Sequence, residues 1–171
     1  RGLPIFERYV ALKEFLAKKG IEVHTYDMYR SKSDIDLWLM LEITPKNLFF
    51  FLAHFVNPKK VIPILLEPSI VNLFQWKYIS IWSRLFKTVM TWSPDLVKKY
   101  KNFIRFDYIP FAFNKAQCEA LHTRPKKDKC LLIQSNKASK VPGELYTLRR
   151  EIIRYFEAKS PEFFDLLGRG W

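Results

Sequence analysis

The chain has 171 residues, 49% hydrophobic and 16% aromatic, and this composition excludes a disordered chain because it supplies enough apolar surface for a core. Its 29 Lys and Arg against 17 Asp and Glu give a formal net charge of +12, which favours an anionic partner such as nucleic acid, a phosphorylated small molecule or an acidic membrane surface. Two cysteines without CxxC spacing indicate neither a disulfide framework nor a zinc site, and no apolar run reaches the ~20 residues of a membrane helix.

The first predicted element is a helix that ends at Gly20. Its apolar residues recur every three or four positions, so we expect one stripe packed against a core: Ile5, Tyr9, Leu12 and Leu16. Residues 21–26 (IEVHTY) alternate in polarity like a strand, and residues 37–43 (LWLMLEI) are typical of a buried strand.

Two later helices are predicted from the same start signal. The signal is Thr44-Pro45 in one helix and Ser93-Pro94 in the other. The hydroxyl can accept a hydrogen bond from a free N–H of the first turn, and the proline fits the first helical position because it has no N–H to satisfy. A continuous apolar run at residues 61–67 (VIPILLE) predicts a strand covered on both faces, and residues 85–92 (LFKTVMTW) and 102–110 (NFIRFDYIP) are further strand candidates. Alternating strands and helices favour a Rossmann-like α/β fold, with a mostly parallel sheet and helices on both faces.

A polar, charged segment at residues 122–129 (HTRPKKDK) predicts a boundary, which divides the chain into domains 1–125 and 126–171. The second domain opens with a buried strand at 130–135, continues with a helix and returns to a strand at 163–168. A single βαβ unit cannot cover its own sheet. We therefore expect the second domain to be only begun within this sequence.

Glu67 is the first candidate for chemistry, because it follows an apolar strand at the end of a sheet where ligands bind in open α/β folds. Partial desolvation by Leu65 and Leu66 would raise its pKa and suit it to accept a proton from a hydroxyl. The alternative is structural, with Glu67 capping a turn or pairing with Lys59 or Lys60. The aromatic stretch at 72–82 has two similar interpretations, a sugar-stacking surface or core.

The second candidate is the strand-to-helix segment that contains Ser135, Asn136, Lys137 and Arg149. Free N–H groups at a helix start and nearby cations both favour a phosphate. The glycine spacings of NTPases and dinucleotide-binding proteins are absent from it. The structural alternative makes Asn136 a turn residue and Arg149 a solvated helix residue.

Three segments together resemble glycosyltransferase family ten, the α-1,3/1,4-fucosyltransferases and their bacterial relatives. They are ILLEPSIV at 64–71, FKTVMTWSPDLVKKYKNFIRFDYIPFAF at 86–113, and 129–171, where Ser-Asn, Leu-Tyr and Asp-Leu-Leu-Gly-Arg-Gly-Trp follow in order. The resemblance implies a two-domain GT-B fold: an N-terminal acceptor domain and the start of a domain that binds a nucleotide sugar. It also implies inverting transfer of fucose from GDP-fucose to a glycan, without a cofactor or an essential metal.

Carried over by position, the resemblance makes Glu67 the general base, although Pro68 follows it directly where the family has Ser. Asn136 and Arg149 match residues near the donor pyrophosphate, with Lys137 as a looser match and Ser135 beside them. The family's Phe-Glu-Asn and Tyr-x-Thr-Glu-Lys donor signature does not occur in these residues, so we expect the fragment alone to be inactive.

The leading hypothesis is therefore a fucosyltransferase-like enzyme that touches an anionic membrane peripherally. Its compartment stays open: cytoplasmic or peripheral to the membrane in a bacterium, Golgi lumen in a eukaryote. The alternative is a non-catalytic basic α/β module for nucleic acid or anionic membrane. Its support is the net charge and four dispersed Lys-Lys pairs, and nucleic acid is disfavoured because no known nucleic-acid-binding pattern accompanies them.

Overall fold

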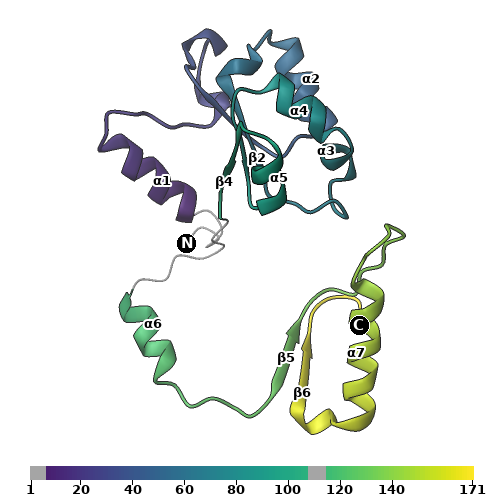
Figure 1. The fold of residues 1–171 in the computed structure, drawn as a ribbon. Coiled ribbons are helices and arrows are strands. Elements are labelled where there is room, and N and C mark those ends of the chain that lie inside the picture. Colours follow the sequence, from purple (N-terminus) through teal and green to yellow (C-terminus); the bar gives the residue numbers. More distant parts are fainter. Residues whose placement is uncertain (1–6, 108–114) are drawn as a thin grey trace. The chain divides into compact units, whose positions relative to one another are not determined.

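The computed structural model describes residues 7–107 and 115–171 (Figure 1). The chain divides into two compact units, residues 1–113 and 114–171. This division assigns helix α6 (Lys115–His122) to the second unit, whereas the predicted boundary assigns it to the first. In the described part of the chain no helix is both long and apolar enough to cross a membrane.

The first unit alternates strands and helices along the chain. Its strands are β1 (Trp38–Leu41), β2 (Val61–Leu65), β3 (Val89–Thr91) and β4 (Phe103–Arg105). Its helices are α1 (Glu7–Ala17), α2 (Pro45–Ala53), α3 (Leu73–Lys77), α4 (Ile79–Leu85) and α5 (Pro94–Lys99), with short 3-10 turns η2 (Tyr26–Met28), η3 (Lys32–Asp34) and η4 (Pro58–Lys60).

All four strands are parallel and lie side by side in chain order, β1-β2-β3-β4. Trp38 pairs with Val61, Leu65 with Thr91, and Val89 with Phe103. The α/β class with a parallel sheet is thus confirmed, while the GT-B arrangement stays a prediction.

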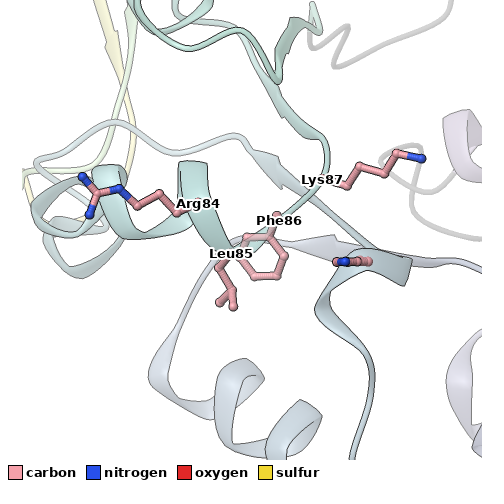
Figure 2. Close-up of a pocket in the computed structure, with 5 residues that line it drawn as sticks. Arg84, Leu85, Phe86 and Lys87 are labelled. Atoms are coloured by element: carbon pink, nitrogen blue, oxygen red, sulfur yellow. The ribbon is translucent and has the colours of Figure 1, made fainter.

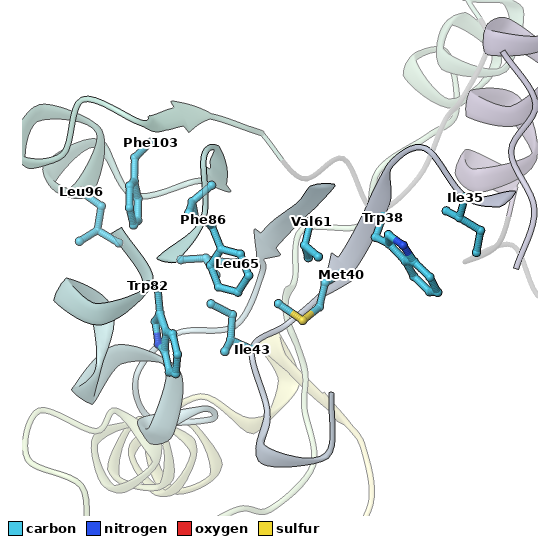
Figure 3. Packing of buried hydrophobic residues seen from close by; sticks show 11 residues of the cluster. Ile35, Trp38, Met40, Ile43, Val61, Leu65, Trp82, Phe86, Leu96 and Phe103 are labelled. Carbon is cyan, nitrogen blue, oxygen red and sulfur yellow. The ribbon is translucent and has the colours of Figure 1, made fainter. Parts of the chain in front are cut away.

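The core lies between one face of this sheet and the helices that connect its strands. One cluster contains side chains from β1, β2, β3 and β4 together with Trp82 of α4 and Leu96 of α5. Figure 3 shows Leu65 of β2 and Phe103 of β4 among its members. Phe50 and Phe51 of α2 pack against the same cluster, and each contacts the Trp38 ring edge-on. Both predicted cap signals are confirmed, since Thr44 Oγ1 accepts the Asn47 N–H and Ser93 Oγ accepts the Leu96 N–H.

The second face of the sheet is less covered, and this corrects the prediction of helices on both faces. Along β1, Trp38 and Met40 are buried, whereas Leu39 and Leu41 remain 42% and 43% exposed. Ile104 of β4 is 43% exposed. The physical reason is the strand order: right-handed crossovers that all step in one direction put their helices on one face.

Two further expectations for the first unit are wrong. Residues 21–26 form no strand, because no described strand lies beside them, and the chain enters η2 instead. Helix α1 forms, and the turn after it ends at Gly20 with a positive φ of 74°. Of the expected stripe, Tyr9 and Leu16 are only half-buried, Leu12 is 39% exposed, and Ile5 lies outside the described residues.

The second unit contains one βαβ element, as predicted. Strands β5 (Cys130–Ile133) and β6 (Phe164–Leu167) pair in parallel, and α7 (Tyr146–Lys159) and a short turn η5 (Pro161–Phe163) connect them (Figure 1). Phe164 is buried and stacks on Phe156 of α7, with ring centroids 5.1 Å apart. The predicted burial of the first strand is wrong, because Leu131 and Ile133 face away from α7 and are 51% and 71% exposed.

Candidate functional site

The carboxyl ends of β1, β2 and β3 bring three loops of the first unit to one edge of the sheet. Glu42 follows β1 directly, Glu67 lies two residues after β2, and Trp92 follows β3. Ligands of open parallel sheets bind outside this edge. It is therefore the place to look for a site.

Glu42 organises the edge, and sequence reasoning missed it. Its backbone is left-handed, with φ of 65°, which is uncommon for a residue other than glycine. Its Oε1 accepts the N–H groups of Leu66 and Glu67 at 2.5 and 2.8 Å, and its Oε2 accepts from Asn72 Nδ2 at 2.9 Å. One carboxylate thus fixes the loop that follows β2 to the end of β1.

Asn72 and Gln75 extend this network into the core. Asn72 Nδ2 also donates to the Ile43 carbonyl, while its Oδ1 accepts the Gln75 N–H and caps α3. Gln75 is fully buried, and its Oε1 accepts the Ile43 N–H at 2.9 Å. The first turn of α3 is therefore bonded to the residue after Glu42 from two directions, which makes the loop rigid.

Glu67 has a fixed backbone and an exposed side chain. Its N–H is bound by Glu42, and its carbonyl accepts the Trp76 Nε1–H at 2.9 Å. Among the described residues its carboxylate forms no ion pair, so the predicted alternative of a pairing with Lys59 or Lys60 is not found. The expected desolvation by Leu65 is also not found, because Leu65 points into the core and Glu67 is exposed.

Two tryptophans lie beside Glu67 at the same edge. The ring centroids of Trp76 and Trp92 are 6.0 Å apart, and Trp92 is 37% exposed. The rest of the aromatic stretch at 72–82 belongs mainly to the core, which was one of its two predicted interpretations. Trp82 is buried, and Phe74 and Tyr78 pack around it. An exposed carboxylate on a loop whose backbone bonds one indole of a tryptophan pair suits a ligand with both hydroxyl groups and apolar C–H faces.

In the second unit, the predicted donor residues lie on the segment after β5. Asn136 donates its backbone N–H to the Arg169 carbonyl at 2.8 Å and its Nδ2 to the Gly170 carbonyl at 2.9 Å. Trp171 Nε1 donates to the Gln134 carbonyl at 2.6 Å. The Asn136 side chain therefore holds the segment after β6 in place, which is a structural role but not the turn-forming one of the predicted alternative.

Gly168 allows the two segments to approach. A Cβ atom at this position would lie 1.8 Å from the Gln134 carbonyl oxygen, so no larger residue fits without a shift of the backbone. The Leu-Gly-Arg-Gly-Trp sequence thus has a structural reason within this unit, namely close backbone contact with Gln134 and Asn136.

An open hollow of about 250 Å³ adjoins Asn136. It is lined by Asn136, Arg150, Ile153, Arg154, Glu157 and Trp171. Arg149 is not among these residues; its guanidinium lies over the Tyr146 ring, 5.5 Å from the centroid. Lys137 is exposed and Ser135 half-buried. Sequence reasoning missed Arg150 and Arg154, whose spacing of four on one helix was the available signal.

At the start of α7, two of the N–H groups expected to face a phosphate are bound by the chain itself. The Glu144 carboxylate accepts the N–H groups of Tyr146 and Thr147 and the Thr147 hydroxyl. The hydrogen bond from the Thr147 side chain, assisted by these backbone N–H groups and Arg150, lowers the pKa of Glu144. The chain's own acid occupies the place predicted for the anion.

Within the described ranges no group of three or more His, Cys, Asp or Glu side chains is arranged to hold a metal ion. No protein-family model matches the chain, and neither does any curated protein or solved structure compared with it.

Proposed function

We propose that the chain belongs to a fucosyltransferase-like glycosyltransferase, in which the first unit holds the glycan acceptor and the second begins the site for a nucleotide sugar such as GDP-fucose. The observation that carries the proposal is the exposed carboxylate of Glu67, held by a rigid loop next to the Trp76–Trp92 pair. A sugar presents C–H faces that stack on indole rings and hydroxyl groups that bind a carboxylate. Both partners are present at one edge of one sheet.

The reaction assigns one step to Glu67. Its carboxylate removes the proton from an acceptor hydroxyl as that oxygen attacks the anomeric carbon of the donor. The bond from the anomeric carbon to the nucleoside diphosphate breaks, its electron pair leaves on the diphosphate oxygen, and the anomeric configuration inverts. Fixing both the N–H and the carbonyl of Glu67 restricts where its side chain can reach, which supports a positioned base.

In the second unit, Arg150 and Arg154 support a diphosphate site better than Arg149 does. Both line the hollow beside Asn136, and guanidinium groups bind phosphate oxygens in pairs. Charge stabilisation of the departing diphosphate is the natural role for them. The donor sugar itself rests on the family resemblance.

The test is turnover by the whole gene product with GDP-fucose and an oligosaccharide acceptor, followed as GDP release. Glu67→Gln should lower kcat about 100-fold or more with little change in KM, because the amide cannot accept the proton. Asp95→Asn is the matched control, since Asp95 is an exposed acid that follows β3 at the same edge, and it should keep wild-type turnover.

Two outcomes would reject the proposal. One is the absence of GDP release with every acceptor tried, together with no protection of the protein by GDP against thermal unfolding. The other is a Glu67→Gln enzyme as fast as the Asp95→Asn enzyme, which would leave the transfer without its base.

A further inference from the structure

The amino end of the same sheet is strongly basic. Because the strands are parallel, the segments that enter β2, β3 and β4 meet at this edge, opposite Glu67. They carry seven cations: Lys59, Lys60, Arg84, Lys87, Lys98, Lys99 and Lys101. Residues 58–106 contain nine Lys and Arg but only two acids, Glu67 and Asp95, and both acids follow strand ends at the other edge. The basic edge also carries two acids, Asp34 and Asp36, in the segment before β1.

An open hollow of about 390 Å³ lies at this edge, lined by Lys59, Arg84, Leu85, Phe86 and Lys87. Figure 2 shows the Arg84 and Lys87 side chains extending away from each other on either side of Phe86. None of the three cations forms an ion pair within the described residues. Because these two cations point in different directions, they cannot bind the same phosphate. They suit a surface that carries many phosphate groups.

Exposed apolar side chains lead into this basic edge. Phe49, Leu52 and Phe55 are 72%, 74% and 95% exposed. Phe49 and Leu52 lie three residues apart on the last turns of α2, and Phe55 follows two residues after the helix ends. Four residues after Phe55 the chain reaches Lys59 and Lys60. Apolar and basic groups are thus joined in one continuous stretch.

Phe55 occupies a position that normally belongs to glycine. The Val56 N–H donates to the Phe51 carbonyl at 2.9 Å and the Phe55 N–H to the Leu52 carbonyl at 3.1 Å, which is the Schellman motif that ends a helix. Phe55 therefore has φ of 52°, a conformation that costs energy for any residue with a Cβ. An almost fully exposed ring regains none of this cost by packing, so the stability of the fold does not explain Phe55.

We propose that these groups form a docking surface for an anionic lipid bilayer. The amino-edge patch comprises Phe49, Leu52, Phe55, Lys59, Lys60, Arg84 and Lys87. Its apolar side chains would enter the boundary between headgroups and acyl chains, while its cations meet lipid phosphates. A nucleic acid backbone would satisfy the cations but offers no apolar layer for Leu52 and Phe55. The proposal does not depend on sugar transfer, because it concerns the opposite edge of the sheet.

Co-sedimentation of the 171-residue chain with vesicles tests the lysines. Binding is expected to vesicles of phosphatidylcholine mixed with phosphatidylglycerol and not to phosphatidylcholine alone. Replacing Lys59 and Lys60 by Gln should weaken binding roughly fivefold for each lysine. The matched control replaces Lys126 and Lys127 by Gln, an exposed pair in the second unit, and should leave binding within about twofold of wild type because it lies outside the patch.

Phe55→Gly tests the apolar part and cannot be confused with misfolding. Glycine relieves the left-handed strain, so the melting temperature should rise by a few degrees, on the order of 4 °C. Vesicle binding should nevertheless fall about tenfold, because the inserted ring is lost. Phe15→Ser is the control: Phe15 is 57% exposed on α1, outside the patch, and its removal should not change binding.

Four results would each overturn the proposal. They are equal binding to neutral and anionic vesicles; equal losses from the two lysine pairs; unchanged binding by Phe55→Gly; and competition by inorganic phosphate at matched ionic strength, which would indicate a single-phosphate site. Tighter binding to a mixed-sequence DNA duplex than to anionic vesicles would assign the patch to nucleic acid instead.

Discussion

Within the described residues, two amino acids other than glycine have positive φ angles, Glu42 at 65° and Phe55 at 52°. They lie at opposite edges of one sheet, Glu42 after β1 and Phe55 before β2. Strain of this kind persists when surrounding contacts or a function require it. For Glu42 the contacts are visible, since its carboxylate accepts three hydrogen bonds. At Phe55 the two hydrogen bonds that end α2 account for the left-handed backbone, but its exposed ring has no packing that would offset the cost of a Cβ there.

Glu42→Ala should destabilise the first unit by about 3 kcal/mol, because two backbone N–H groups and the Asn72 amide lose a charged acceptor. Urea unfolding followed by tryptophan fluorescence measures this loss. Asp95→Ala removes the same charge from an exposed position at the start of α5 and should cost less than about 1 kcal/mol. Equal losses from the two variants would mean that Glu42 acts through its charge rather than through its hydrogen bonds.

At the scale of elements, local signals were reliable. The hydroxyl and proline pairs at Thr44 and Ser93 predicted α2 and α5 correctly, since capping depends on a few neighbouring residues. The strand expected at 21–26 failed because a strand needs a partner, and pairing is set far away in the chain. The exposure of β5 could not be read from its apolar sequence, because burial depends on what covers each face of a strand and not on the strand alone.

The candidate site was predicted only in part. The apolar pattern of β2 correctly placed Glu67 at the end of a strand. The Glu42 carboxylate that accepts its N–H lies 25 residues earlier in the chain, and only the folded sheet brings the two together. Arg149 was predicted because it matches the family's helix arginine, and the sequence does not give the rotation of α7 that brings Arg150 and Arg154 to the hollow. Only the structure shows that Arg149 lies over Tyr146.

The start of α7 gives a pH dependence that can be measured. Hydrogen bonding from the Thr147 side chain lowers the pKa of Glu144 below its ordinary value of 4.5, so the folded unit binds fewer protons there than the unfolded chain. The stabilisation is fully present above that ordinary pKa and is lost as the pH falls through the lowered folded value. Melting followed by far-UV circular dichroism in neutral and acidic buffer should show this loss.

Glu144→Gln should remove the part of the stability loss at acidic pH that comes from Glu144, because an amide does not titrate. Glu151→Gln, an exposed acid in the middle of α7, should retain it in full. Acid curves that coincide for the wild-type chain and the Glu144→Gln variant would show that the capping carboxylate does not contribute to the pH dependence of unfolding.

For the molecule as a whole, the strand order separates two kinds of surface. Helices on one face leave the other face of the first sheet apolar and open at Leu39, Leu41 and Ile104. The two edges differ in charge, with acids and tryptophans at the carboxyl end and cations at the amino end. A parallel sheet keeps the two sets of loops apart, because every connection begins at one edge and finishes at the other, and the residues in those loops then give each edge its charge.

Neighbouring residues on β1 test which face carries the core. Met40 is 3% exposed and Leu41 is 43% exposed, although both are large apolar residues on the same strand. Met40→Ala should cost about 3 kcal/mol through lost burial and a cavity, whereas Leu41→Ala should cost no more than about 1 kcal/mol. Urea unfolding of the two variants measures the difference. Neighbouring residues of a strand point to opposite faces of the sheet, so their replacement by Ala can cost the same stability only when both faces are packed. Equal losses would therefore mean that the second face is covered in solution and that the one-sided layer arrangement is wrong.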